Sequence, residues 1–243
     1  MNLVSSASRQ IILDTETTGM NQGAGPVYVG HRIIEIGCVE VINRKLTGRH
    51  FHEYINPDQK IDEEAIAVHG ITDEQVANCP RFRDIAQRFI EFVDGAEIVA
   101  HNASFDVSFL DYELSMLAPK GPKLHDICGI LDTLALAKHL HPGQKNNLDA
   151  LCKRYHIDNA RRELHGALLD AEILADVYLA MTGGQTKFNL SLGEQGSGEA
   201  GGIIRLPEGR NRLKVVAASA DELGMHEQRL ALVAKSGKCL WRG

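Results

Sequence analysis

Two acidic side chains, Asp14 and Glu16, stand two positions apart after a short apolar run. In a strand, residues two apart point to the same face, so both carboxylates would project together. Such a like-charge pair is unfavourable unless a cation lies between the two groups. The pair therefore suggests a metal site, and the alternative is a strand-end turn with solvated acids.

A third acid, Asp106, ends the segment HNASFD at residues 101–106. This segment follows a short apolar strand and begins a helix. Asp106 could be a further metal ligand, or it could simply stabilise the positive end of the helix dipole. Asn102 or Ser104 could likewise be an ordinary N-cap.

His165 and Asp170 lie five positions apart at the start of the longest helical pattern. Five residues along a helix turn through about 140° from a shared face, so the two could not face the same way if both were helical. We therefore place His165 on the loop before the helix and Asp170 inside it. A mobile histidine beside a fixed carboxylate suits a base that must reach a water molecule.

The combined set of three Asp and one Glu, without cysteine, is an oxygen-rich set suited to two divalent ions, Mg²⁺ or Mn²⁺. Two such ions about 4 Å apart stabilise the attacking and leaving oxygens of phosphodiester hydrolysis. His165 would deprotonate the water, which predicts a rate that increases with pH until this histidine is neutral.

Two other groups of residues could be considered as metal sites. A histidine-rich set fits no ligand spacing, and a loop before a strand is the preferred interpretation. Asp132 could be a fifth carboxylate, although N-capping of a helix explains it sufficiently. The histidine-rich set comprises His125, Asp126, Cys128, His139 and His141.

The elements that would position these residues are strands first and helices later. Three extended segments at 10–13, 32–41 and 51–55 predict an antiparallel meander. A capping box at 72–75 and apolar periodicity from 82 to 92 indicate helix, followed by a strand at 97–100. Further helices are expected at about 104–117, 132–139, 147–155 and 166–181. This order predicts an α/β domain with a mixed sheet flanked by helices.

The composition changes after residue 184. Residues 191–202 contain five glycines, which predicts a flexible linker. Residues 203–243 hold a strand-like piece at 213–216 and one helix with a capping box at 219–222. About forty residues are too few to fold alone without disulfides or metal, so a partner would have to order them. The alternative is a disordered tail.

The overall composition excludes several classes of protein. A net charge of −6 disfavours an autonomous binder of duplex DNA, because such affinity rests on many Lys and Arg contacts. We expect neither a membrane-spanning helix nor a secretory signal. The five cysteines include no CxxC pair, which disfavours zinc and disulfide frameworks and fits a cytoplasmic location.

The segments LDTETTG, HNASFD and LHGALLDAEILADVYLAMTGGQT resemble the histidine-bearing branch of the DEDD exonuclease superfamily. The resemblance spans about residues 9–186 and is closest to the proofreading subunits of bacterial DNA polymerase III, with further similarity in LKVV and CLWRG near the C-terminus. It implies a ribonuclease-H-like fold over residues 1–184 and 3′→5′ exonuclease activity. Asp14, Glu16, Asp106 and Asp170 would be the metal ligands and His165 the general base.

The resemblance also implies contacts with the terminal nucleotide. Asp14, Glu16 and Asp170 would take part, and Thr15 would lie next to the 3′ end. Glu64 and His69 match family positions that touch this nucleotide; the alternative places them on the surface of a helix and a loop.

Partners are implied in the same way, with the single-stranded 3′ end of DNA as substrate. Gln185, Phe188 and Leu190 look like a sliding-clamp motif ahead of the linker, in a segment spanning 185–202, although an ordinary helix exit would also explain them. Residues 203–243 would bind the polymerase's catalytic (alpha) subunit, and the small theta subunit is a third candidate.

Two alternatives to a DNA proofreader remain. A free-standing RNA or oligoribonucleotide exonuclease would use the same chemistry, although it would have no need of the C-terminal segment. A purely structural polymerase subunit would give no physical reason for four clustered carboxylates and a histidine.

Overall fold

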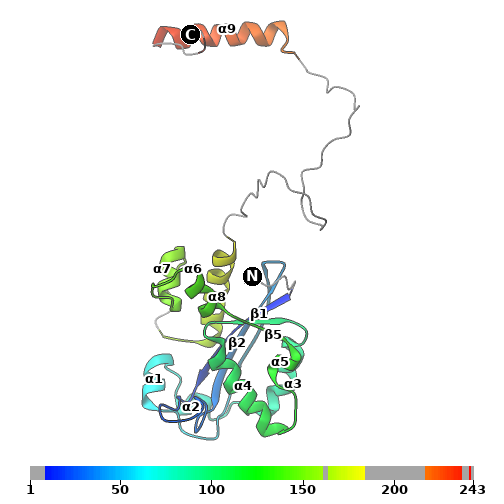
Figure 1. Ribbon diagram of the computed structural model, residues 1–243, viewed down its shortest axis with the longest axis vertical. Coiled ribbons are helices and arrows are strands. Elements are labelled where there is room, and N and C mark those ends of the chain that lie inside the picture. Colours follow the sequence, from blue (N-terminus) through cyan, green and yellow to red (C-terminus); the bar gives the residue numbers. More distant parts are fainter. Residues whose placement is uncertain (1–8, 161–163, 184–216, 237–240, 242–243) are drawn as a thin grey trace, which may run out of the picture. The chain divides into compact units, whose positions relative to one another are not determined.

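A computed structural model describes residues 9–160, 164–183, 217–236 and 241 (Figure 1). The chain divides into two compact units, residues 1–188 and 189–243, and each is described by itself. The predicted clamp residues Gln185, Phe188 and Leu190, the glycine-rich linker and the strand-like piece at 213–216 lie outside the described residues.

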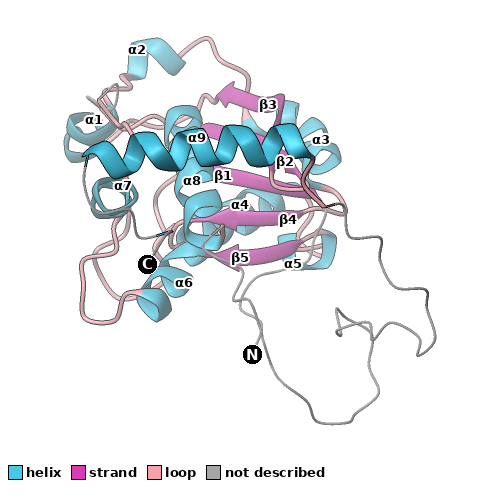
Figure 2. Ribbon diagram, turned by 90° about the horizontal axis from the view of Figure 1, so that it is seen from above, coloured by secondary structure: helices cyan, strands magenta, loops and turns pink. Residues whose placement is uncertain are grey.

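The first unit is built on a five-stranded sheet with the order β3-β2-β1-β4-β5 (Figure 2). The strands β1, β2 and β3 pair antiparallel, whereas β4 and β5 continue the sheet parallel to β1. This arrangement confirms the mixed sheet with antiparallel first strands. The strands are β1 (Arg9–Thr17), β2 (Ile33–Ile42), β3 (Lys45–Tyr54), β4 (Glu97–Ala100) and β5 (Gly129–Asp132).

Two strands are longer than the sequence predicted. β1 continues to Thr17, through Asp14 and Glu16, because its pairing with β2 persists there. β3 begins at Lys45, although the prediction began at 51. The first six residues of β3 are exposed, and an edge strand facing water lacks the apolar alternation by which strands are predicted.

Helices cover both faces of the sheet (Figures 1 and 2). Ile11 and Leu13 of β1 face one core with α3, α4 and α5, whereas Ile12 faces a second core with α6, α7 and α8. By strand alternation, Asp14 and Glu16 point to the side of Ile12. The helices are α1 (Glu63–His69), α2 (Asp73–Val76), α3 (Phe82–Val93), α4 (Ala103–Leu117), α5 (Leu124–Ile127), α6 (Thr133–Leu140), α7 (Leu148–Tyr155) and α8 (Ala167–Thr182).

Several predicted helix starts are confirmed by their caps. The Asp132 carboxylate accepts the backbone N–H of Leu134 at 2.8 Å, and the Asn147 side chain accepts that of Ala150 at 2.9 Å. The capping box at Thr72 is present but starts only the four-residue α2. The longer helix α3 begins separately after it.

The described part of the second unit contains α9 (Ala220–Ser236). The predicted capping box at its start is confirmed, since Ser219 and Glu222 exchange side-chain and backbone hydrogen bonds. None of the described helices has the length and apolar character needed to cross a membrane.

Candidate active site

A cavity lies where β1 ends and α4 and α8 begin. The four predicted carboxylates and the predicted histidine line it together, although they come from three segments far apart in the sequence. These five residues are Asp14, Glu16, Asp106, His165 and Asp170. The chain thus brings every predicted metal ligand and the predicted base to one hollow.

The position of Asp14 and Glu16 follows from the pairing of β1 with β2. Asp14 lies opposite Gly37, and Glu16 lies opposite Glu35. Opposed residues in an antiparallel pair point to the same face. A Cβ atom on Gly37 would lie 2.2 Å from backbone atoms of α8, so this glycine allows the first turn of α8 to lie directly against the strand.

Asp106 is buried in the first turn of α4. The Thr15 hydroxyl donates a hydrogen bond to its carboxylate at 2.7 Å. Burial raises the pKa of Asp106 to about 7, with a further contribution from the negative charge of Asp132, while the bond from Thr15 acts in the opposite direction. A nearby cation would therefore favour the ionised form of this buried carboxyl group.

The predicted N-caps of α4 take a different form. Asn102 does occupy the N-cap position, but with a left-handed backbone (φ 70°) and without a side-chain capping bond. Its backbone N–H instead donates to Asp132 at 3.0 Å. Asp132 thereby joins the starts of α4 and α6, which supports the capping interpretation of this residue.

His165 lies on the loop before α8, and Asp170 lies inside the helix, as the angular argument predicted. The His165 Nδ1 atom is 3.6 Å from an Asp170 oxygen. The two side chains differ in exposure, at 45% for His165 and 3% for Asp170. The histidine can therefore exchange protons with water while the carboxylate beside it is held in place.

The donor atoms fit a divalent cation. One ligand atom each from Glu16, His165 and Asp170 lie within 4.8 Å of one another. Asp14 and Asp106 line the same cavity but are outside this tight group. Oxygen ligands dominate the set, and hard cations such as Mg²⁺ or Mn²⁺ prefer carboxylate oxygens.

A second hollow adjoins the first and shares Glu16 and Phe105 with it. Glu64 and His69, the residues matched only by resemblance, both line this second hollow. Glu64 is exposed, whereas His69 is buried, so the alternative of a surface histidine is wrong.

The orientation of the His69 ring is fixed by a hydrogen bond from a nearby backbone N–H group. The His69 Nδ1 atom accepts the backbone N–H of Ile71 at 3.0 Å, which places the ring proton on Nε2 when the ring is neutral. Burial lowers the pKa of His69, against an opposing contribution from the Thr17 backbone. A neutral, oriented histidine is suited to donating a hydrogen bond from Nε2.

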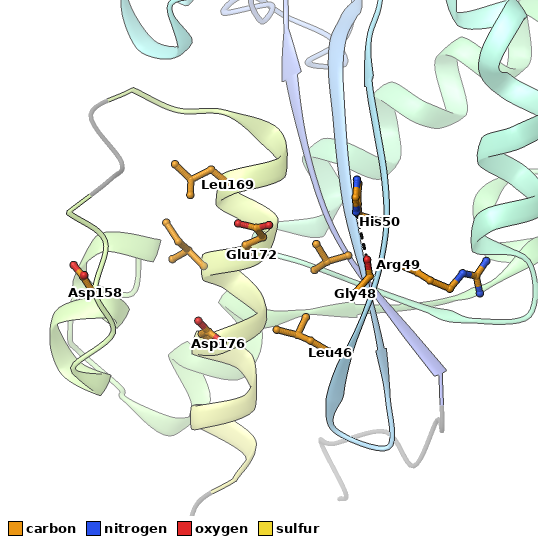
Figure 3. Close-up of a pocket in the computed structure, with 10 residues that line it drawn as sticks. Leu46, Gly48, Arg49, His50, Asp158, Leu169, Glu172 and Asp176 are labelled. Carbon is orange, nitrogen blue, oxygen red and sulfur yellow. Dashed lines mark hydrogen bonds between the residues drawn. The ribbon is translucent and has the colours of Figure 1, made fainter.

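A separate hollow lies between β3 and the outer side of α8 (Figure 3). Glu172 and Asp176 of α8 line it with Leu46 and His50 of β3. Residues two apart on a helix differ by about 200° in direction, so Glu172 faces away from Asp170. None of the predicted catalytic acids lines this hollow, and only Asp170 among the acids of α8 lines the catalytic cavity.

The loop predicted for the first part of the histidine-rich set is wrong, because the short helix α5 precedes β5. His125 lies in the short helix α5 and forms an exposed ion pair with Asp126 at 3.3 Å. None of these residues belongs to the group of Glu16, His165 and Asp170, whose ligand atoms lie within 4.8 Å of one another.

Sequence reasoning missed part of the cavity wall. Phe105 lies inside the HNASFD segment and received no role, and Asn147 and Asp149 at the start of α7 also line the cavity. The buried Glu35 was missed too. A lone acid within the apolar run Ile33–Ile36 was a usable signal, because acids are almost never fully buried without a partner.

Comparisons with known proteins agree with this geometry. The exonuclease family model matches residues 11–178. DNA polymerase III subunit epsilon of Salmonella typhimurium is 56% identical over 97% of this chain and 98% of its own length, and that of Escherichia coli is 54% identical with the same shares. Among solved structures, exonuclease X in complex with 5′ overhanging duplex DNA has 30% identity and a TM-score of 0.55, covering 72% of this chain and 91% of that one.

Proposed function

Because this chain belongs to the exonuclease family, and within it to the DNA polymerase III epsilon subunits, we propose that its cavity removes mispaired nucleotides from the 3′ end of DNA during replication. The chain is a metal-dependent 3′→5′ exonuclease. The single observation that carries the assignment of the site is the convergence of the four predicted carboxylates and His165 in one hollow.

His165 is the general base in this proposal. Its ring is the exposed member of the pair with Asp170, so it can take a proton from a water that attacks the terminal phosphodiester. Asp170 lies 3.6 Å from Nδ1 and stabilises the imidazolium that forms. The proton then leaves to solvent from the exposed ring.

Asp14, Glu16, Asp106 and Asp170 would hold two divalent ions, Mg²⁺ or Mn²⁺. When bound, these ions stabilise the negative charge that develops on the phosphate in the transition state. The Thr15 hydroxyl holds the Asp106 carboxylate through its hydrogen bond. This bond positions the Asp106 carboxylate before the substrate arrives.

The terminal nucleotide would occupy the adjoining hollow. Met20, Val68 and Phe105 give it an apolar wall, and Glu64 and His69 are among its polar groups. A base could lie against the apolar wall, while Glu64 and the Nε2–H of His69 bind the 3′-terminal sugar. Thr15 is proposed to lie next to the 3′ end, and Asp14, Glu16 and Asp170 to contact the phosphate through the ions.

The protein partners are part of the same proposal. Residues 203–243 would bind the catalytic (alpha) subunit of the polymerase, and Gln185, Phe188 and Leu190 the sliding clamp. The theta subunit is proposed as a third partner. The acidic net charge of −6 supports an enzyme whose DNA is held by its partners.

The test is digestion of 5′-labelled single-stranded DNA and matching RNA, with Mg²⁺ and with chelator. We expect metal-dependent shortening from the 3′ end that prefers DNA. Asp14→Ala and His165→Ala should remove it, and Asp176→Ala, on the outer side of α8, is the matched control. Faster loss of RNA would favour the RNA exonuclease, and a folded chain inactive on both strands would favour a structural subunit.

A further inference from the structure

The start of α8 lacks the cap that a helix normally supplies for itself. Its N-cap residue is Gly166, which has no side chain to accept a backbone N–H. The first N–H groups of a helix have no acceptor within the helix, and leaving one buried without a partner is unfavourable. His165, the predicted base, directly precedes Gly166. The acceptor that binds the first N–H groups of α8 therefore also affects the position of His165.

The missing acceptor comes from another element. The Ala167 backbone N–H donates to the Glu35 carboxylate at 3.0 Å, and the bond is buried. Glu35 lies on β2, opposite Glu16, and is only 2% exposed. Its other oxygen lies 2.7 Å from Nε2 of His52, on β3. The carboxylate is thus held between the edge of the sheet and the positive end of α8, which stabilises its charge.

The segment before α8 is also held from its other side. The His165 backbone N–H donates to the Val68 carbonyl of α1 at 3.2 Å. The three-residue segment His165–Ala167 is therefore attached at both ends, to α1 and to Glu35. Neither attachment uses the His165 ring, whose Nδ1 atom lies 3.6 Å from Asp170.

We propose that Glu35 is a positioning residue that caps α8 from the neighbouring strand. It thereby holds the backbone of His165 and Asp170 in the position needed for catalysis. The inference rests on the proposed function of the cavity and adds to it a residue that touches neither substrate nor ion. Displacing reacting groups by 1 Å can lower a rate by about 10²-fold, so loss of this bond should act on kcat.

The test compares two substitutions at Glu35 in the full chain. Glu35→Gln keeps an oxygen that can accept the Ala167 N–H, whereas Glu35→Met keeps the volume and removes the acceptor. We expect Glu35→Met to lower kcat on single-stranded DNA by about 10²-fold with little change in KM, and Glu35→Gln to retain most of the activity. Equal loss in both variants, or a loss confined to KM, would overturn the proposal.

The chain provides a matched control in Glu40. This residue is also a buried acid on β2, but its partners are Arg9, Arg49 and Thr47 and not α8. Glu40→Met should lower the unfolding temperature without lowering kcat. If Glu40→Met and Glu35→Met lower kcat alike, general destabilisation explains both and Glu35 has no positioning role.

One further measurement separates this inference from the proposed function. Amide hydrogen exchange at Ala167 should accelerate in Glu35→Met but not in Glu40→Met, and this readout needs no activity. If the unmodified chain digested no DNA, the function would fail while the exchange result still tested the cap.

Discussion

At the scale of single residues, the cavity contains a carboxyl group whose charge is unfavourable without a counter-ion. Asp106 is 3% exposed, and burial raises its pKa from the ordinary 3.8 to about 7. The Thr15 hydroxyl opposes the shift only in part. A divalent ion next to Asp106 would lower this pKa, because an opposite charge favours the ionised form.

This raised pKa predicts how the stability of the metal-free chain changes with pH. Between about pH 4 and pH 7 the unfolded chain loses the Asp106 proton while the folded chain keeps it, so the free energy of unfolding falls as pH rises. The fall is at most about 1.4 kcal/mol per pH unit. Urea unfolding in chelator at several pH values should show it, and Asp106→Asn should remove this part of the slope.

The same variant tests the metal. Mg²⁺ should raise the unfolding temperature of the unmodified chain, because an ion that binds only the folded state stabilises it. Asp106→Asn should show a smaller increase and lose exonuclease activity. An equal increase in both proteins would mean that Asp106 is not a ligand.

At the scale of elements, the catalytic groups depend on how closely α8 approaches β2. Gly37 lies directly against this helix, since a Cβ atom there would meet the Ala167 and Leu168 backbone at 2.2 Å. Both residues belong to the first turn of α8, which also carries Asp170. The position of Asp170 relative to Asp14 and Glu16 is therefore set by the absence of one side chain.

Gly37→Ala should consequently push α8 away from the sheet. Overpacking of this kind costs about 1–3 kcal/mol of stability, and we expect kcat to fall as well because His165 and Asp170 move together. Gly129→Ala in β5 is the matched control, since its Cβ atom would meet nothing closer than 3.5 Å. Urea unfolding and digestion of single-stranded DNA would measure both effects; normal activity in Gly37→Ala would refute the argument.

Local patterns were sufficient to predict most helices and strands whose apolar residues face a core, but not the short helices α1 and α5. The periodicity of α3 and α8 and the spacing of His165 and Asp170 are of this kind. The exposed start of β3 had no such pattern. The bond from Ala167 to Glu35 joins residues 132 positions apart, so only the folded chain shows it, although the acid inside an apolar strand indicated that a partner was needed.

At the scale of the whole molecule, the chain consists of two units with different tasks in the proposal. Residues 1–188 contain the entire cavity, and residues 189–243 form the second unit. The net charge of −6 means that DNA binding by the chain alone rests on few phosphate contacts. The second unit would therefore increase activity by association with a partner and not by chemistry.

Removing residues 189–243 should leave kcat/KM on free single-stranded DNA unchanged, because every cavity residue remains. Binding to the catalytic subunit of the polymerase should disappear, as measured by gel filtration of the mixed proteins. A truncated chain that is folded but inactive would show that the second unit contributes to the site itself. Retained binding would place the polymerase contact in residues 1–188.

The proposed metal ligands and base come from β1, α4 and the start of α8, and this order has a consequence during synthesis on the ribosome. A nascent chain that has emerged only through α4 contains Asp14, Glu16 and Asp106, but neither His165 nor Asp170. Hydrolysis therefore becomes possible only after α8 has emerged and settled against β2. A nascent chain therefore cannot hydrolyse nucleic acid until synthesis has passed the end of α8 at Thr182.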